Sequence, residues 1–175
     1  MNREGRRFFL ATGLALVGFG RRVWAQVAGL PIRYAALTRP VRIPLQDVTE
    51  PWQPVAFVAE AMAPATTTAP PRRVLISGVL FRTPANLSAL CVTCPHEQCQ
   101  VDLVTDQARL RRMSDGTPTR PLFECGCHLS LFDAAADGAR LSGEAPRGLY
   151  RFRIANTSGE AVEITGIEDV ALSEV

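Results

Sequence analysis

The sequence contains no lysine and only two histidines, so every side chain with a permanent positive charge is an arginine. Five of the 19 arginines lie in the first 25 residues, together with a single acidic residue. The rest of the chain therefore has 14 arginines against 16 acidic residues, a net charge of −2. Proteins that bind nucleic acid carry an excess of positive charge on their surface. The composition thus argues against nucleic acid as a partner.

The N-terminal apolar run is too short to cross a bilayer as a helix. It covers 13 residues, 8–20, before Arg21 and Arg22 interrupt it, whereas a spanning helix needs about 20. A basic start, a short apolar run and small residues up to Ala25 are typical of a signal peptide that is cleaved after that residue. The pair Arg6 and Arg7, just ahead of the apolar run, matches the pattern of a twin-arginine export signal.

We therefore expect residues 1–25 to be a twin-arginine-type signal peptide or a short anchor, and residues 26–40 to be a tether or a first strand. The body of the protein would then be periplasmic. It would be membrane-associated if it belongs to a membrane complex or keeps an uncleaved N-terminus. Disulfides persist in that compartment, so the cysteines of this chain are candidates for disulfides as well as for metal ligands.

Helical periodicity is weak along the chain, and no internal repeat is visible. Short apolar or alternating runs predict strands instead, and the last of them predicts a hairpin around turn residues 156–159. Pro44 lacks a backbone N–H, which favours an edge strand there. Gly78 predicts a bulge or a close approach, and residues 61–71 a surface loop or linker. The predicted strands are 41–45, 55–58, 73–82, 87–92 and those of the hairpin at 150–164. They indicate an all-β fold, a sandwich or a small barrel.

Both histidines and all five cysteines gather in one part of the chain. The cysteines fall within 37 residues, and each histidine follows a cysteine by two or three positions. Scatter at random would rarely produce this pattern. The residues are Cys91, Cys94, His96, Cys99, Cys125, Cys127 and His128.

Three interpretations compete for this constellation. Two disulfides and a spare thiol suit an exported domain but leave both histidines unexplained. A zinc ion accepts two cysteines and two histidines, although zinc sites usually place the cysteines in one loop and the histidines in another. A two-iron, two-sulfur cluster can take two thiolates on one iron and two imidazoles on the other. That arrangement needs one ligand of each type from each of two loops, as Cys94 with His96 and Cys125 with His128 supply them.

The segments CPHEQC (94–99) and CGCHLSLFD (125–133) resemble the two cluster-binding loops of Rieske iron–sulfur proteins. Gly143-Glu-Ala-Pro146 is more weakly similar to a third loop of that family, so the resemblance covers about a third of the chain. Each of the first two loops also has an extra cysteine, Cys99 or Cys127, and in this respect the chain resembles the high-potential Rieske proteins of cytochrome bc-type complexes. The resemblance implies a Rieske-type antiparallel β sandwich or barrel over residues 41–175, with a small cluster-binding subdomain at about 91–147.

The resemblance also implies a role for each matching residue. Cys94 and Cys125 would bind the inner iron of a [2Fe–2S] cluster, and His96 and His128 the outer one. Other residues would support the cluster: a Cys99–Cys127 disulfide joining the loops, a hydrogen bond from Ser130 to a bridging sulfide, and a cover formed by residues 143 to 146, including Pro146. Cys91 matches no ligand, and we expect it to be a small buried residue on the strand that enters the site.

The chain also departs from the family pattern. Phe132 stands where many high-potential members have a tyrosine whose hydroxyl bonds a ligand sulfur, which predicts a potential below the top of the Rieske range. Glu97 and Gln98 replace an apolar residue and a glycine. Glu97 is expected either beside the histidines or in solvent. The arginine-rich stretch 109–120 is predicted to be a hairpin or loop at the cluster end, as a docking patch for an acidic partner or a solvated loop.

These features predict an exported electron-transfer subunit that does not turn over a substrate alone. The leading hypothesis is the iron–sulfur subunit of a quinol–cytochrome c oxidoreductase, whose partners would be cytochrome b- and c-type subunits and a quinol. The alternative is the small Rieske subunit of an exported molybdenum enzyme of the arsenite-oxidase type, paired with a molybdenum-containing large subunit. A hypothesis of another class is a zinc-stabilised binding module without a redox role.

Overall fold

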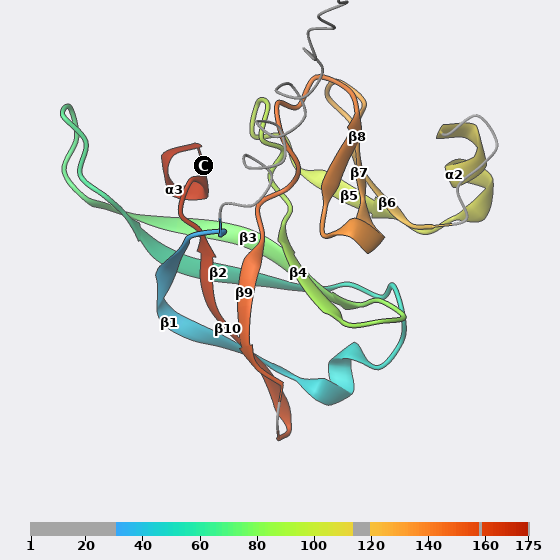
Figure 1. Ribbon diagram of the computed structural model, residues 1–175, viewed down its shortest axis with the longest axis horizontal. Coiled ribbons are helices and arrows are strands. Elements are labelled where there is room, and N and C mark those ends of the chain that lie inside the picture. Colours follow the sequence, from blue (N-terminus) through green and yellow to red (C-terminus); the bar gives the residue numbers. More distant parts are fainter. Residues whose placement is uncertain (1–30, 114–119, 158, 175) are drawn as a thin grey trace, which may run out of the picture. The chain divides into compact units, whose positions relative to one another are not determined.

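The computed structural model describes residues 31–113, 120–157 and 159–174 (Figure 1). The predicted signal peptide and the centre of the arginine-rich stretch lie outside these residues. Residues Arg33–Val175 belong to one compact unit. Within the described residues, no helix is long and apolar enough to cross a membrane.

Six antiparallel strands form the larger sheet, in the order β4-β3-β2-β1-β10-β9. Its two edge strands approach each other, because Leu90 and Arg151 form an isolated antiparallel bridge and the Cys91 N–H donates to the Tyr150 carbonyl at 2.8 Å. The sheet is therefore a nearly closed barrel. Its strands are β1 (Tyr34–Pro44), β2 (Val55–Ala63), β3 (Arg72–Arg82), β4 (Leu87–Cys91), β9 (Phe152–Asn156) and β10 (Ala161–Glu168).

Alternating burial along the strands produces the barrel core. In β2, Ala59 and Ala61 are buried whereas Val58 and Met62 are exposed, as expected where successive side chains point to opposite faces. The core also holds large apolar side chains of β3, β9 and β10, namely Ile76, Leu80, Phe152, Val162, Ile164 and Ile167.

Gly78 lets two aromatic rings approach the backbone of β3. A Cβ atom there would overlap the rings of Phe57 and Phe152, which pack edge to face with centroids 4.9 Å apart. The pairing of β3 with β2 and β4 runs through Gly78 without a register shift. Of the two interpretations of this glycine, close approach is correct and the bulge is not.

Four further antiparallel strands form a smaller sheet in the order β5-β6-β7-β8. They are β5 (Val101–Val104), β6 (Leu122–Cys125), β7 (Ser130–Asp133) and β8 (Ala139–Ser142). The two sheets share an apolar cluster, to which Phe81 and Leu90 of the barrel and Phe123 and Phe132 of the smaller sheet contribute. The rings of Phe81 and Phe123 lie 5.8 Å apart. This shared cluster supports the loops that carry the cysteines and histidines.

The helical elements of the described residues are short. They are η1 (Leu45–Val48), α2 (Gln107–Met113), η2 (Ala134–Ala136) and α3 (Ala171–Glu174). Helix α2 corrects the prediction of a hairpin or loop over 109–120. The Asp106 carboxylate accepts a hydrogen bond from the Arg109 N–H at 2.7 Å, which caps the helix, and Leu110 is fully buried.

The prediction of an all-β fold is confirmed, and two local predictions need correction. Strand β1 lies between β2 and β10 and is not an edge strand. Among the described residues, β1 pairs with β2 at Leu37 and with β10 along the half that ends at Pro44. That half has no described strand on its other side, so the missing N–H of Pro44 breaks no hydrogen bond there. Ala61 and Ala63, predicted to lie in a surface loop, are buried at the end of β2. Their small apolar side chains continue the period-two pattern of the strand.

Candidate metal centre

Two tight loops at one end of the smaller sheet carry the predicted ligands. The first cysteine loop, 94–99, is closed by hydrogen bonds from the Cys94 N–H to the Cys99 carbonyl at 2.8 Å and from the Gln98 N–H to the Cys94 carbonyl at 3.1 Å. The second cysteine loop, 125–130, is the turn between β6 and β7, in which Cys125 and Ser130 are paired. Sheet pairing and these short bonds therefore fix the start and the end of each loop.

A disulfide between Cys99 and Cys127 joins the two loops. Its sulfurs are 2.07 Å apart and the two Cα atoms 6.6 Å apart. The disulfide joins positions 28 apart in the sequence, so it keeps the two loops together even when the rest of the chain is unfolded.

The two other cysteines of these loops lie next to each other in the interior. Cys94 and Cys125 are both about 1% exposed, and both are free. Burial raises the pKa of the Cys94 thiol above its ordinary value; backbone N–H donors of His96 and Glu97 lower it, and the hydrogen bond with the Cys125 side chain raises it. The Cys94 sulfur is thus enclosed by amide donors and a second sulfur, an environment that suits a thiolate bound to a metal.

The two histidines lie side by side at the surface of the same loops. Their ring centroids are 4.8 Å apart and the rings meet edge to face. The His96 and His128 side chains are 27% and 37% exposed. Their Nε2 atoms face outward toward carboxylates: His96 lies 3.8 Å from Glu144, and His128 lies 3.9 Å from Glu97. The Glu97 side chain was expected either beside the histidines or in solvent. It lies beside His128 and is also 61% exposed to solvent.

The other nitrogen of His96 provides a test of whether a metal fits. Its Nδ1 atom is buried and has no hydrogen-bond partner among the described residues. A buried polar atom without a partner is costly, and native proteins rarely leave one unsatisfied. A metal ion bound to Nδ1 removes that cost, so the residues present fit a metal at the inner side of His96.

Among the described residues, two groups of side chains bring three possible ligand atoms within 4.8 Å of one another. They are Cys99, Cys125 and Cys127, and His96, Glu97 and His128. Cys99 and Cys127 are committed to the disulfide, which leaves Cys125 and its neighbour Cys94 as the thiol donors. The centre therefore has a buried sulfur side and a partly exposed imidazole side.

Ser130 connects the second cysteine loop to the loop at 143–146. It is fully buried, and its hydroxyl oxygen accepts a hydrogen bond from the Ala145 N–H at 3.0 Å. A hydroxyl that accepts through its oxygen keeps its hydrogen for donation to another group. Gly143 has a positive φ of 90° and packs so closely on Ser130 that a Cβ atom would overlap it. Pro146, at the end of this loop, is exposed.

Phe132 and Cys91 are both fully buried, in different cores. Phe132 belongs to the apolar cluster beneath the cysteine loops, and Cys91 to the barrel core at the end of β4. Burial raises the pKa of the free Cys91 thiol. This cysteine is therefore a buried residue of the barrel core, as predicted, and does not belong to the apolar cluster beneath the cysteine loops.

Ion pairs within the smaller sheet engage part of the arginine-rich stretch. Arg109 pairs with Glu124, and Arg120 lies 3.3 Å from a carboxylate oxygen of Asp133. Arg111 and Arg112 are exposed on α2. Since two of the arginines contact carboxylates of the protein itself, the stretch offers less free positive charge to an acidic partner than its sequence suggests.

The sequence did not predict the contacts or the conformation of three residues at the site. Glu144 lies beside His96 although 48 positions separate them, and Glu174 contacts the first cysteine loop from the C-terminal helix. Leu129 follows His128 with a positive φ of 53° and is 66% exposed. In the sequence, the one signal for Leu129 was its position directly after His128. Glu144 belongs to the loop that was expected to cover the cluster, but its contact with His96, like that of Glu174 with the first cysteine loop, arises from the packing of distant segments.

A scan against protein-family models found no family that matches this chain, and a search of the curated proteins found no similar sequence. The conclusions about function therefore rest on the residues of the site and on their geometry.

Proposed function

We propose that this chain is an exported electron-transfer protein that holds a Rieske-type [2Fe–2S] cluster between its two cysteine loops. Cys94 and Cys125 would be the ligands of the inner iron, and His96 and His128 those of the outer iron. The observation that carries the proposal is the division of the donors. Each loop contributes one buried thiol and one partly exposed imidazole, and like donors lie together.

A single zinc ion is supported less well by the same geometry. The four donor atoms of a tetrahedral zinc site lie about 2.0–2.3 Å from the ion, so they all lie within about 4 Å of one another. Among the described residues, no group of three donor atoms within 4.8 Å joins a cysteine to a histidine: the two imidazoles gather with a carboxylate, and the gathered sulfurs are that of Cys125 and the two of the disulfide. Two separate metal positions, one for each kind of donor, agree better with this arrangement.

When bound, such a cluster carries one electron at a time, and imidazole ligands at its exposed end couple that electron to a proton. The residues of this chain would prepare the site for that chemistry. With a cluster bound, the Nε2 atoms of His96 and His128, which both lie beside carboxylates, would be the positions that exchange a proton. The hydrogen of the Ser130 hydroxyl would be available to a sulfur of the cluster. The apolar cluster beneath, including Phe132, keeps water from the inner side.

The N-terminal sequence and the proposed ligands support a proposal for the setting in which this protein works. We place it in the periplasm after twin-arginine export, as the iron–sulfur subunit of a quinol–cytochrome c oxidoreductase. The disulfide between the loops favours this class over cytoplasmic Rieske proteins. The alternative, a small subunit that serves a molybdenum enzyme, is favoured by the short N-terminal apolar run, which suits a cleaved signal better than a membrane anchor.

Iron and acid-labile sulfide analysis of the purified full chain tests the proposal. We expect two irons and two sulfides per chain and no stoichiometric zinc. The matched variants Cys94→Ser and Cys91→Ser sharpen the test, because both change a buried free cysteine three positions apart. The first should lose all iron and the second should keep it. One zinc per chain, or iron retained in Cys94→Ser, would contradict the proposal. Capture of the native complex then separates a cytochrome b partner from a molybdenum subunit.

A further inference from the structure

Gln98 is an unexpected residue for its place in the first cysteine loop. It has a positive φ of 57°, a left-handed conformation that glycine adopts without a steric cost and other residues adopt with one. It lies between His96 and Cys99, where the Rieske loops resembled by this chain usually have glycine. A side chain at a position that suits glycine raises the question of what that side chain contacts.

The side chain of Gln98 reaches the C-terminal helix. Its Nε2 donates a hydrogen bond of 2.6 Å to the backbone carbonyl of Glu174, 76 positions away. The last carbonyls of a helix have no partner within the helix and need an outside donor. The bond therefore satisfies the end of α3 and ties the first cysteine loop to it.

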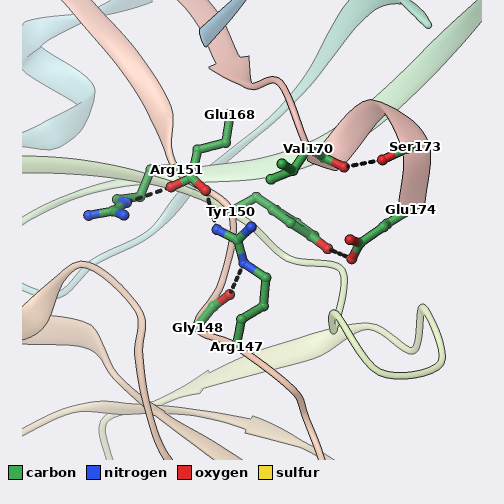
Figure 2. Close-up of polar contacts among 8 residues, drawn as sticks. All are labelled: Arg147, Gly148, Tyr150, Arg151, Glu168, Val170, Ser173 and Glu174. Atoms are coloured by element: carbon green, nitrogen blue, oxygen red, sulfur yellow. Dashed lines mark hydrogen bonds and ion pairs between the residues drawn. The ribbon is translucent and has the colours of Figure 1, made fainter. Parts of the chain in front are cut away.

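Helix α3 is in turn fixed to the barrel. Ala171 and Leu172 are buried in the barrel core, and the hydroxyl of buried Tyr150 donates to the carboxylate of Glu174 (Figure 2). Burial, with a further contribution from Glu174, raises the pKa of Tyr150, so its hydroxyl remains a proton donor at neutral pH. Glu174 thus accepts from the cysteine loop through its carbonyl and from the barrel through its carboxylate.

The third loop of the site is attached at the same place. Arg147, directly after Pro146, pairs with the buried carboxylate of Glu168, which Arg151 also contacts (Figure 2). The Arg147 guanidinium lies over the Tyr150 ring, 4.6 Å from its centre. One cluster of side chains on the barrel therefore holds two of the three loops around the metal centre.

We propose that Gln98 is a positioning residue, and that its bond to Glu174 forms a latch between the first cysteine loop and α3. The latch fixes the orientation of His96 and Cys99 relative to the barrel. The effect on a cluster bound through His96 rests on the proposed function, whereas the contact between loop and helix does not. The amide of Gln98 makes this contact from a backbone conformation that glycine would adopt at a lower cost.

Hydrogen exchange of the full chain, purified with its bound metal, tests the latch independently of the kind of metal. In Gln98→Gly the backbone is relieved but the latch is lost. Exchange at the amides of Cys94 and position 98, which close the loop, should become about 2- to 13-fold faster, the change expected from the loss of one hydrogen bond. Gln100→Gly, at an exposed position just after the disulfide, is the matched control and should leave these rates unchanged. Equal rates in Gln98→Gly and wild type would overturn the latch.

Tyr150→Phe tests whether the latch works through Glu174. It keeps the ring but removes the hydroxyl that holds Glu174, and it should speed exchange in the cysteine loop although Tyr150 does not belong to that loop. Unchanged exchange there would show that α3 holds the loop without the barrel and would contradict the scheme. If this variant does not fold, the exposed Gln98→Gly and Gln98→Glu variants carry the test, since an ionised glutamate has the same size but no donor.

The midpoint potential tests the positioning role itself. Gln98→Gly should shift the potential and the g values of the centre, whereas Gln100→Gly should not. Faster exchange in Gln98→Gly with an unchanged potential would overturn the role in positioning His96. Absence of an iron–sulfur centre would overturn the proposed function and leave the exchange result on the latch intact.

Discussion

The barrel and the two cysteine loops are stabilised by different interactions. The barrel depends on apolar side chains whose burial alternates along regular strands: buried residues alternate with exposed or half-buried ones in β2, and with half-buried ones in the first part of β10. The loops have left-handed residues at Gln98 and Leu129, a disulfide, and a few polar bonds to distant segments. Burial of apolar area stabilises a fold without prescribing atomic positions, whereas a metal centre needs fixed donor atoms. The loops are therefore the part of the molecule in which single polar contacts matter.

The largest effect on stability alone is expected in the barrel. Phe152→Ala would leave a cavity beside Phe57 and Gly78, and we expect a loss of about 3–5 kcal/mol in the free energy of unfolding. Chemical denaturation measures it. The iron content and spectrum of the folded fraction should remain those of the wild type, because Phe152 lies in the barrel core. A changed spectrum would mean that the two regions are not separable in this way.

Removal of the disulfide should weaken the loops. In Cys99→Ala/Cys127→Ala the chain loses a link between positions 28 apart, for which the loop-entropy relation gives about 3–4 kcal/mol. Unlike Phe152→Ala, this variant should also lose iron more rapidly to a chelator. Denaturation and chelation measured on the same sample separate the two effects. Iron loss at the wild-type rate would contradict a role of the disulfide in holding the loops.

Ser130→Ala should have a smaller effect on stability and a specific one on the potential. The buried Ala145 N–H would lose its acceptor, at a cost of about 1–3 kcal/mol. The midpoint potential should fall, because a hydrogen bond to the cluster stabilises the more negative reduced state. Ser130→Thr, which keeps the hydroxyl, is the control in protein-film voltammetry. A potential unchanged in Ser130→Ala would exclude that hydrogen bond.

Phe132→Tyr should have the smallest effect on stability and should raise the potential. The ring is fully buried beneath the cysteine loops, and a hydroxyl added there can donate to a ligand sulfur. Protein-film voltammetry of the variant beside the wild type measures the shift. A midpoint equal to that of the wild type would refute the view that the missing tyrosine hydroxyl lowers the potential.

The sequence predicted regular parts of this fold better than the contacts between them. Alternation located β9 and β10. The short spacing of cysteines and histidines marked the candidate site, and the resemblance to Rieske loops supplied the four candidate ligands, which remain a prediction. Helix α2 was not predicted, because it spans only seven residues and has one buried side chain, Leu110, which is too little for a helical period to show in the sequence. The resemblance predicted the loop 143–146 at the site, but the contact of Glu144 with His96 could not be predicted, since it depends on how distant segments pack. Local pattern encodes elements and motifs, whereas the polar contacts around a centre arise from the whole fold.

The most direct test of the central claim is the electron-spin-resonance spectrum of the reduced, purified protein. A [2Fe–2S] cluster with two thiolate and two imidazole ligands predicts a rhombic signal with a low average g value, at one spin per chain. The signal should disappear on oxidation and be absent in Cys94→Ser. A colourless, zinc-loaded protein that gives no signal after reduction would contradict the account.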